Sequence, residues 1–160
     1  MTIDQEKMEL AIKAYGTVDR MGCLIAFKSN VPEYFTTEEI KDFDAFLTRL
    51  ESDGNKTRFY VMKYNDKIIG CGGYGDKDNT GIISLTWGLI HQDFHKQGFG
   101  KKLLLYRLDQ IKMLKPRVPV LIDTTQYSYG FFEKHGFKTT KITPDYYEIG
   151  MHRYDMTFER

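Results

Sequence analysis

The middle of the chain alternates between apolar and polar residues, a pattern typical of strands. Residues 58–64 and 67–75 are rich in strand-forming residues, and the Asn65-Asp66 pair between them is a hairpin signal. A polar turn follows and leads to a third run over 81–90. Three consecutive antiparallel strands are therefore expected.

Apolar residues at helical spacing predict two helices before this meander. The first has the apolar stripe Met21, Leu24 and Ile25, and the second opens with a capping-box sequence over 36–39. Residues 8–15 fit both an alternating strand and a helical stripe, and the pattern alone leaves that choice open.

A helix, a strand and a closing pair of strands are predicted after the meander. The buried face of the helix would comprise Leu104, Leu108, Ile111 and Leu114. The apolar run 118–124 is typical of a buried parallel strand. The remaining elements are a short helix over 126–135 and strands over 137–142 and 149–158. The order predicts an α+β (mixed α/β) fold with one β-loop-α-β crossover.

Composition bounds the class of protein. The chain has 160 residues, 23 Lys and Arg against 22 Asp and Glu, and a net charge of +1, which argues against nucleic acid as an obligatory partner. The apolar runs are too short to span a bilayer, and Asp4 and Glu6 stand where a signal peptide would be positive. Cys23 and Cys71 form no metal-spaced cluster. We expect a single cytoplasmic domain over residues 1–160, without a metal or a membrane partner.

The segment 95–101 carries the first sign of chemistry, because Gly98 and Gly100 lie between lysines where a strand leads into a helix. Glycines let the backbone approach a bulky anion, and N–H groups at a helix N-terminus bind phosphate oxygens. The segment is neither a Walker loop, since Lys-Lys-Leu follows Gly100, nor a dinucleotide fingerprint, since Leu103 takes the third glycine position. A tight turn with solvated lysines is the alternative to a nucleotide of another kind.

A second segment downstream reads Phe132-Glu133-Lys134-His135-Gly136-Phe137. Together the two segments resemble the GCN5-related N-acetyltransferase (GNAT) superfamily, which carries Arg/Gln-x-x-Gly-x-Gly/Ala after a strand and Tyr/Phe-Glu-Lys-x-Gly-Phe later. The resemblance extends over most of the chain. It implies a GNAT-like fold, with a mostly antiparallel twisted sheet of about seven strands, splayed between strands 4 and 5 and flanked by about four helices. It favours the strand over 8–15, and Trp87-Gly88 is a plausible bulge near the splay.

The resemblance implies that the chain binds acetyl-CoA. Leu89 and Ile90, at the end of the fourth strand, match the residues whose backbone pairs with the pantetheine arm. The pyrophosphate loop would comprise His95, Lys96, Gln97, Gly98, Phe99, Gly100 and Lys101. Beyond the fifth strand, the cofactor positions fall on Thr125, Ser128 and Phe132.

Two positions depart from the family pattern. His95 stands where the family has Arg or Gln, so one phosphate contact would be weaker or depend on pH. Phe132 stands where many members have a tyrosine that protonates the departing thiolate, and a phenyl ring cannot donate a proton. Tyr129, three residues earlier on the same helical face, could take that role. Packing on the sheet is the alternative for Tyr129, and water could also protonate the thiol.

The acceptor side needs a base, because an amine must be neutral to attack a thioester. Asp123, at the end of an apolar strand, is the first candidate, with a capping or turn role as its alternative. Glu33 and His91 are weaker candidates. Surface positions are expected for His91, His135 and His152. The acceptor pocket implied by the family would comprise Glu33, Tyr34, Phe35 and Trp87, with Tyr146 and Tyr147 as candidates from the closing strands.

We therefore expect an N-acetyltransferase that transfers the acetyl group of acetyl-CoA directly to a primary amine of a small molecule or peptide. Neither cysteine falls in a motif of an activated nucleophile, which favours direct attack. A catalytically silent acyl-CoA-binding or sensor module is the alternative, and an oxygen acceptor stays open. The chain is expected to be a monomer or a homodimer.

Overall fold

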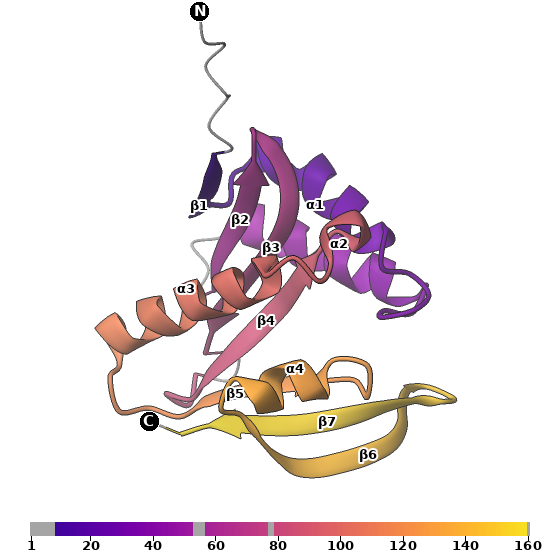
Figure 1. Ribbon diagram of the computed structural model, residues 1–160, viewed down its shortest axis with the longest axis vertical. Coiled ribbons are helices and arrows are strands. Elements are labelled where there is room, and N and C mark those ends of the chain that lie inside the picture. Colours follow the sequence, from indigo (N-terminus) through magenta and orange to yellow (C-terminus); the bar gives the residue numbers. More distant parts are fainter. Residues whose placement is uncertain (1–8, 53–56, 77–78, 160) are drawn as a thin grey trace, which may run out of the picture.

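The computed structural model describes residues 9–52, 57–76 and 79–159. Within them, seven strands form one sheet in the order β1-β2-β3-β4-β5-β7-β6 (Figure 1). The strands are β1 (Leu10–Ala14), β2 (Arg58–Tyr64), β3 (Lys67–Gly75), β4 (Ile83–Ile90), β5 (Val120–Thr124), β6 (Lys138–Glu148) and β7 (Met151–Phe158). The helices are α1 (Arg20–Lys28), α2 (Glu39–Ser52), α3 (Phe99–Leu114) and α4 (Tyr129–Lys134), with the 3-10 helices η1 (Thr17–Asp19) and η2 (Gln92–Phe94). The predicted fold class is confirmed.

The sheet divides at β4 and β5, which are parallel. Strands β1 to β4 form an antiparallel meander, and β5, β7 and β6 form a second antiparallel group. Strands β4 and β5 pair only at Ile83–Val120 and Ser84–Leu121. The rest of β4 therefore has no strand beside it on the β5 side, which is the predicted splay.

A bulge interrupts β4 beside this division. The register of β4 against β3 shifts between Cys71 and Gly73, so that Trp87 and Gly88 together face one residue of β3. Trp87 has φ 44°, a conformation that bulky residues rarely adopt. The bulge predicted at these two residues is confirmed, and it bends β4 away from a straight course.

Helices cover both faces of the sheet (Figure 1). Helices α1 and α2 pack on one face in a core cluster that includes Phe27 and Phe43. Helices α3 and α4 pack on the other face, where Leu104 and Phe132 belong to a second cluster. Among the described helices, none has both the length and the apolar content that crossing a membrane requires.

Local signals in the sequence account for several boundaries. Asn65 and Asp66 have φ 50° and 64°, as a type I′ hairpin turn requires. At the start of α2, the Glu39 N–H donates to Thr36 Oγ1 at 3.2 Å and the Thr36 N–H donates to Glu39 Oε1 at 3.1 Å. The predicted capping box is therefore confirmed. The predicted strand over 8–15 is β1, although Met8 lies outside the described residues.

The buried faces of α1 and α3 differ from the prediction. Met21 and Ile25 are 67% and 53% exposed, and α1 buries instead Cys23, Ala26 and Phe27. An ideal Cβ at Gly22 would lie 2.7 Å from Ile68 Cδ1, so α1 approaches β3 on its small-residue face. Leu114, the last residue of α3, is also exposed.

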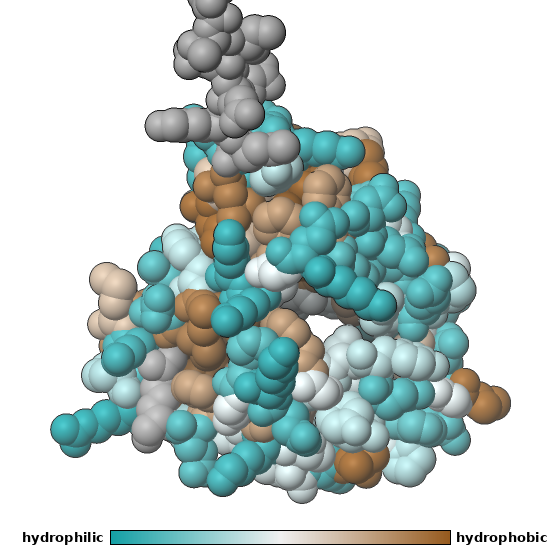
Figure 2. All heavy atoms as spheres, viewed as in Figure 1, coloured by the Kyte–Doolittle hydropathy of each residue, from teal (hydrophilic) through white to brown (hydrophobic). Residues whose placement is uncertain are grey.

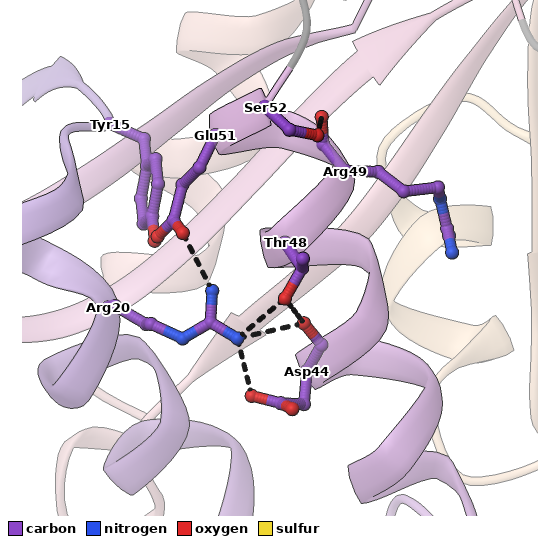
Figure 3. A network of polar contacts seen from close by, with 7 residues as sticks. All are labelled: Tyr15, Arg20, Asp44, Thr48, Arg49, Glu51 and Ser52. Carbon is purple, nitrogen blue, oxygen red and sulfur yellow. Dashed lines mark hydrogen bonds and ion pairs between the residues drawn. The ribbon is translucent and has the colours of Figure 1, made fainter.

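A polar network ties α1 to α2 (Figure 3). Arg20 donates through Nη2 to Asp44 Oδ1 at 2.7 Å and to Thr48 Oγ1 at 3.0 Å. It also donates through Nη1 to Glu51 Oε2 at 3.0 Å, and Tyr15 donates to Glu51 Oε1 at 2.7 Å. The network joins the end of β1 to both helices and so positions the segment between α1 and α2, which lines the cavity described next.

Candidate active site

A cavity of about 780 Å³ opens where β4 and β5 diverge. Its wall is built by the α1–α2 connection with the first residue of α2, most of β4, and the loop before α3 with the first three turns of α3. The end of β5 and the loop after it, α4 and one residue of β6 complete the wall. Figure 2 shows the molecule hollowed in this region. Because residues of both helical layers line the cavity, it passes through the sheet.

One end of the cavity is the loop of glycines and lysines. Gly98, the N-cap of α3, has φ 84°, a left-handed conformation that favours glycine. In the described part of the chain, no heavy atom lies within 4 Å of an ideal Cβ at Gly98, so the space in front of the loop is open. The first-turn N–H groups of α3 have no intrahelical acceptors, and Lys96 and Lys101 line the same wall. This end can therefore hold phosphate groups.

The histidine of this loop is held by β4. His95 Nε2 lies 2.8 Å from the Ile90 carbonyl oxygen, which also accepts a hydrogen bond from Asn30 Nδ2 at 2.9 Å. If Nε2 carries the proton of that bond, the neutral ring has none on Nδ1, and His95 can donate to a phosphate only as imidazolium. His95 thus links the loop to the strand, and its phosphate contact stays a prediction.

Along β4, the backbone N–H and C=O groups of successive residues point alternately toward β3 and toward the gap between β4 and β5. The His91 N–H donates to Ile69 O of β3 at 2.7 Å, so the Ile90 N–H points the other way, toward β5. Leu89 pairs with Cys71, and its backbone polar groups face β3. The geometry therefore favours Ile90 over Leu89 as a backbone partner on the β5 side, and the contact of Leu89 with the cofactor stays a prediction.

The other end of the cavity is acidic. Asp123 Oδ2 accepts a hydrogen bond from the Tyr147 hydroxyl at 2.6 Å, and Asp123 Oδ1 lies 3.9 Å from Arg153 Nη2. Burial raises the pKa of Tyr147, and the Asp123 carboxylate raises it further. Glu39 lines the same wall, and burial raises its pKa as well. Two carboxyl groups and a protonated tyrosine therefore lie together here.

Aromatic rings also line the cavity. Tyr34, Phe35 and Trp87 line the cavity. The Trp87 ring lies 5.8 Å from Phe27 and 5.4 Å from Phe43 between centroids, which fixes its position. A cavity lined by both carboxylates and aromatic rings suits an organic cation.

A sequence profile described as the acetyltransferase (GNAT) domain matches residues 23–160. The chain belongs to the GNAT acetyltransferase family. The predicted family and the predicted acetyltransferase activity are both confirmed at this level. No curated protein sequence matches the chain.

Solved structures of GNAT proteins share this fold. The ribosomal-protein-S18-alanine N-acetyltransferase from Escherichia coli is 15% identical, with a TM-score of 0.76 over 94% of each chain. A GNAT family acetyltransferase from Elizabethkingia anophelis with acetyl-CoA bound is 20% identical, with a TM-score of 0.68 over 94% of this chain and 98% of that one. The aminoglycoside 6'-N-acetyltransferase from Enterococcus faecium is 14% identical, with a TM-score of 0.71 over 93% of this chain and 96% of that one. These likenesses concern the fold.

Most residues predicted for the GNAT site line this cavity. They are Tyr34, Phe35, Trp87, Leu89, Ile90, His95, Lys96, Gly98, Gly100, Lys101, Asp123, Thr125, Ser128 and Phe132. Three loop residues lie outside its lining. Gln97 Nε2 donates to Asp93 O at 3.2 Å, Phe99 packs against Tyr64, and Glu33 accepts from Gln92 Nε2 at 3.5 Å.

Tyr129 also lies outside the lining of the GNAT cavity. Its ring stacks on Tyr154, with centroids 4.4 Å apart and planes 13° apart. Phe132, from the next turn of α4, lines the cavity. The geometry therefore favours the packing alternative for Tyr129 over the role of proton donor.

The histidines and closing-strand tyrosines divide between the cavity and the surface. His135, predicted at the surface, lines the cavity. His91 Nδ1 accepts from the Asp93 N–H at the start of η2 at 3.1 Å, and its side chain is 16% exposed. His152 Nδ1 of β7 accepts from the Asp145 N–H of β6 at 3.0 Å. Tyr147 lines the cavity, whereas Tyr146 is 54% exposed.

Glu39 and Arg107 are among the cavity residues that the sequence reasoning missed. Glu39 was explained by its capping box, which concealed its second position in the cavity wall. Arg107 lies at helical spacing from Leu104 and Ile111, within the apolar stripe of α3. An arginine within a buried stripe was the signal that could have revealed it.

Proposed function

We propose that the protein transfers the acetyl group of acetyl-CoA directly to a primary amine of a small molecule or peptide. The observation that carries this proposal is one cavity that joins the glycine–lysine loop to an acidic, aromatic end through the gap between β4 and β5. When bound, acetyl-CoA supplies a thioester that reacts with amines.

The loop end fits acetyl-CoA. Lys96, Lys101 and the first-turn N–H groups of α3 would hold the pyrophosphate in the open space at Gly98. The Ile90 N–H would pair with the pantetheine arm as a strand partner does. These groups together favour a long, anionic cofactor that enters the gap from this side.

The acidic end fits the amine. Glu39 and Asp123 would attract a cationic amine, and the aromatic wall would hold its carbon skeleton. Asp123 would take the proton from the amine, because only the neutral amine attacks. The hydrogen bond from Tyr147 would keep that carboxylate in one orientation.

The two cysteines support direct transfer. Cys23 and Cys71 are both 0% exposed, so no acceptor or thioester reaches them without a change of structure. Burial also raises the pKa of the Cys71 thiol well above its ordinary value. A buried, protonated thiol is a poor nucleophile, and attack by the amine itself is favoured.

The test has two steps. Thermal unfolding with acetyl-CoA, NAD and ATP comes first, since a ligand at about 100 times its dissociation constant adds about 2.7 kcal/mol. A chain of this length should then melt about 5–10 °C higher with acetyl-CoA alone. Thiol release is measured next across a panel of cationic, neutral and anionic amines, and we expect turnover with cationic ones. A shift with ATP or NAD but not with acetyl-CoA would contradict the proposal.

A silent acyl-CoA-binding module is the second candidate, favoured by the phenyl ring of Phe132 in the cavity wall. Such a module would show the same melting shift with acetyl-CoA. It would release no thiol with any amine of the panel. Turnover that depends on an added amine therefore separates the two functions.

A further inference from the structure

Arg107 is a buried cation in the cavity wall to which the proposed reaction has so far given no role. It lies in the third turn of α3, is 3% exposed and lines the cavity. Its guanidinium packs against the bulge of β4, because an ideal Cβ at Gly88 would lie 2.6 Å from Nη2 and 2.9 Å from Nη1. The glycine at the bulge makes the room that the guanidinium occupies.

The charge of Arg107 is poorly compensated. Nη1 donates to Gly73 O at 3.3 Å, and Nε has no hydrogen-bond partner. Within the described ranges, no carboxylate forms an ion pair with this side chain. Burial lowers the pKa of Arg107 to about 10, so the group is still cationic at neutral pH. An unpaired buried cation is unfavourable for the fold, which indicates that a ligand is its partner.

The proposed reaction produces an anion in this cavity. The lone pair of the neutral amine forms a C–N bond to the thioester carbonyl carbon, and the C–S bond breaks with its electron pair on sulfur. The nitrogen then releases its extra proton to water, because Asp123 already holds the proton taken before the attack, and sulfur is left as a thiolate. Phe132 in the cavity wall cannot protonate it, and Tyr129 is packed against Tyr154.

We propose that the Arg107 guanidinium binds the thiolate of coenzyme A and thereby stabilises the leaving group, an inference that rests on the proposed function. Arg107 lies about 13 Å along α3 from Gly98, deeper in the cavity than the phosphate end. It packs on Gly88, two residues from the Ile90 N–H proposed to pair with the pantetheine arm. A fixed cation lowers the pKa of a thiol and makes it a better leaving group without any proton donor.

The pH dependence of coenzyme A binding tests this inference without any acceptor. Isothermal titration calorimetry gives the affinities of coenzyme A and of desulfo-coenzyme A, which lacks the thiol, between about pH 6.5 and about pH 9.5. The pKa of an ordinary thiol is about 8.5. If the bound thiol has a lower pKa, the ratio of the two affinities rises with pH until the free thiol is also ionised. We expect a rise of about 10- to 100-fold, tenfold for each unit of pKa.

Desulfo-coenzyme A removes the contribution of other titrating groups. Cys71 of β3 lies in the core cluster on the opposite face of the sheet, and its charge acts on Arg107. Lys101 of α3, Asp123 of β5, and Lys134 and His135 of α4 line the same cavity. The effect of their ionisation on the parts that both ligands share cancels in the ratio of affinities, and the variants described next separate Arg107 from groups that act on the thiol itself.

Variants assign the effect to the guanidinium. Arg107→Met should bind desulfo-coenzyme A like the wild type but show a flat ratio, and Arg107→Lys should retain part of the rise. Leu108→Met, on the same helix and also buried, is the matched control and should keep the full rise. Circular dichroism checks that each variant folds, and if Arg107→Met does not, the Lys variant and the wild-type profile carry the test.

A ratio of affinities that stays flat with pH in the wild type overturns the inference, as does the full rise in a folded Arg107→Met variant. Coenzyme A still binds in either case, so the proposed function stands. Failure of the wild type to bind either ligand overturns both. Succinyl-CoA offers a further arm. One contrary result is that the wild type binds succinyl-CoA more tightly than acetyl-CoA, loses this preference in Arg107→Met, and shows a flat ratio of the coenzyme A and desulfo-coenzyme A affinities. That result would assign the guanidinium to a carboxylate and overturn the thiolate site.

Discussion

Replacement of Gly98 by Asp should weaken acetyl-CoA binding without unfolding the protein. An ideal Cβ at this position meets no described heavy atom within 4 Å, so a side chain fits and extends toward the proposed phosphate site. Its carboxylate would lie about 5 Å from two phosphate charges. At an effective dielectric constant of about 40–80, the repulsion amounts to about 2–3 kcal/mol, or about 30- to 150-fold in the dissociation constant.

Two control variants separate charge from backbone strain. Gly98→Asn has the same shape as Gly98→Asp but no charge. Gly81 also has φ 84° and open space at its Cβ position, and it lies between β3 and β4, away from the cavity lining. Gly98→Asn and Gly81→Asn should each cost about 1 kcal/mol, because the left-handed conformation strains an L-residue, and each should melt about 2–4 °C lower.

Calorimetric titration with acetyl-CoA then compares the three variants with the wild type. Only Gly98→Asp should lose the 30- to 150-fold estimated above, about 2–3 kcal/mol. Its difference from Gly98→Asn should shrink when the salt concentration rises from about 0.05 M to about 0.5 M, because added salt screens the repulsion. Equal affinities of the Asp and Asn variants at low salt would refute the assignment of the loop to phosphate.

Three further variants address the acceptor end and the fold. Glu39→Gln keeps the cap on α2. Because burial raises the pKa of Glu39, the wild type should lose stability relative to this variant as pH rises from about 3.5 to about 6.5. Melting temperatures measure this, and a difference that does not change with pH would contradict it. The same variant should raise the KM for a cationic amine. Tyr147→Phe removes a 2.6 Å hydrogen bond to Asp123 and should lower kcat about tenfold while calorimetry finds acetyl-CoA affinity unchanged; a parallel loss of affinity would place Tyr147 at the cofactor. Gly130→Ala, where a Cβ meets nothing within 4 Å, should raise the melting temperature by about 2 °C, and a lower value would reveal a conformational need for glycine in α4.

The features that the sequence predicted correctly depend on short-range interactions. The Asn65-Asp66 turn and the Thr36–Glu39 capping box each bond within four residues, so their residue types suffice to predict them. The glycine loop before α3 is equally local. The bulge at Trp87-Gly88 followed from one glycine in an apolar strand, because glycine tolerates the irregular backbone there.

The features that the sequence did not predict depend on contacts between distant elements. The face that α1 buries is determined by the close approach of Gly22 to Ile68, and no helical pattern contains that contact. The hydrogen bond between Asp123 and Tyr147 joins β5 to β6 across 24 positions. The pattern of one strand also does not show which side its neighbour occupies, so it could not separate Leu89 from Ile90 as the backbone partner of the cofactor.

The distribution of charge along the cavity suggests how two substrates reach one gap. Lys96 and Lys101 line one end, and Glu39 and Asp123 line the other. In the proposed reaction, an anionic cofactor would be attracted to the first end and a cationic amine to the second, so each would bind without competing for the other's site. Arg107 lies between the ends, at the bulge of β4. In the proposed reaction, a cation there would repel the protonated amine and attract sulfur as it becomes negative. The same charge that assists the leaving group would thus favour attack by the amine only after it has lost its proton.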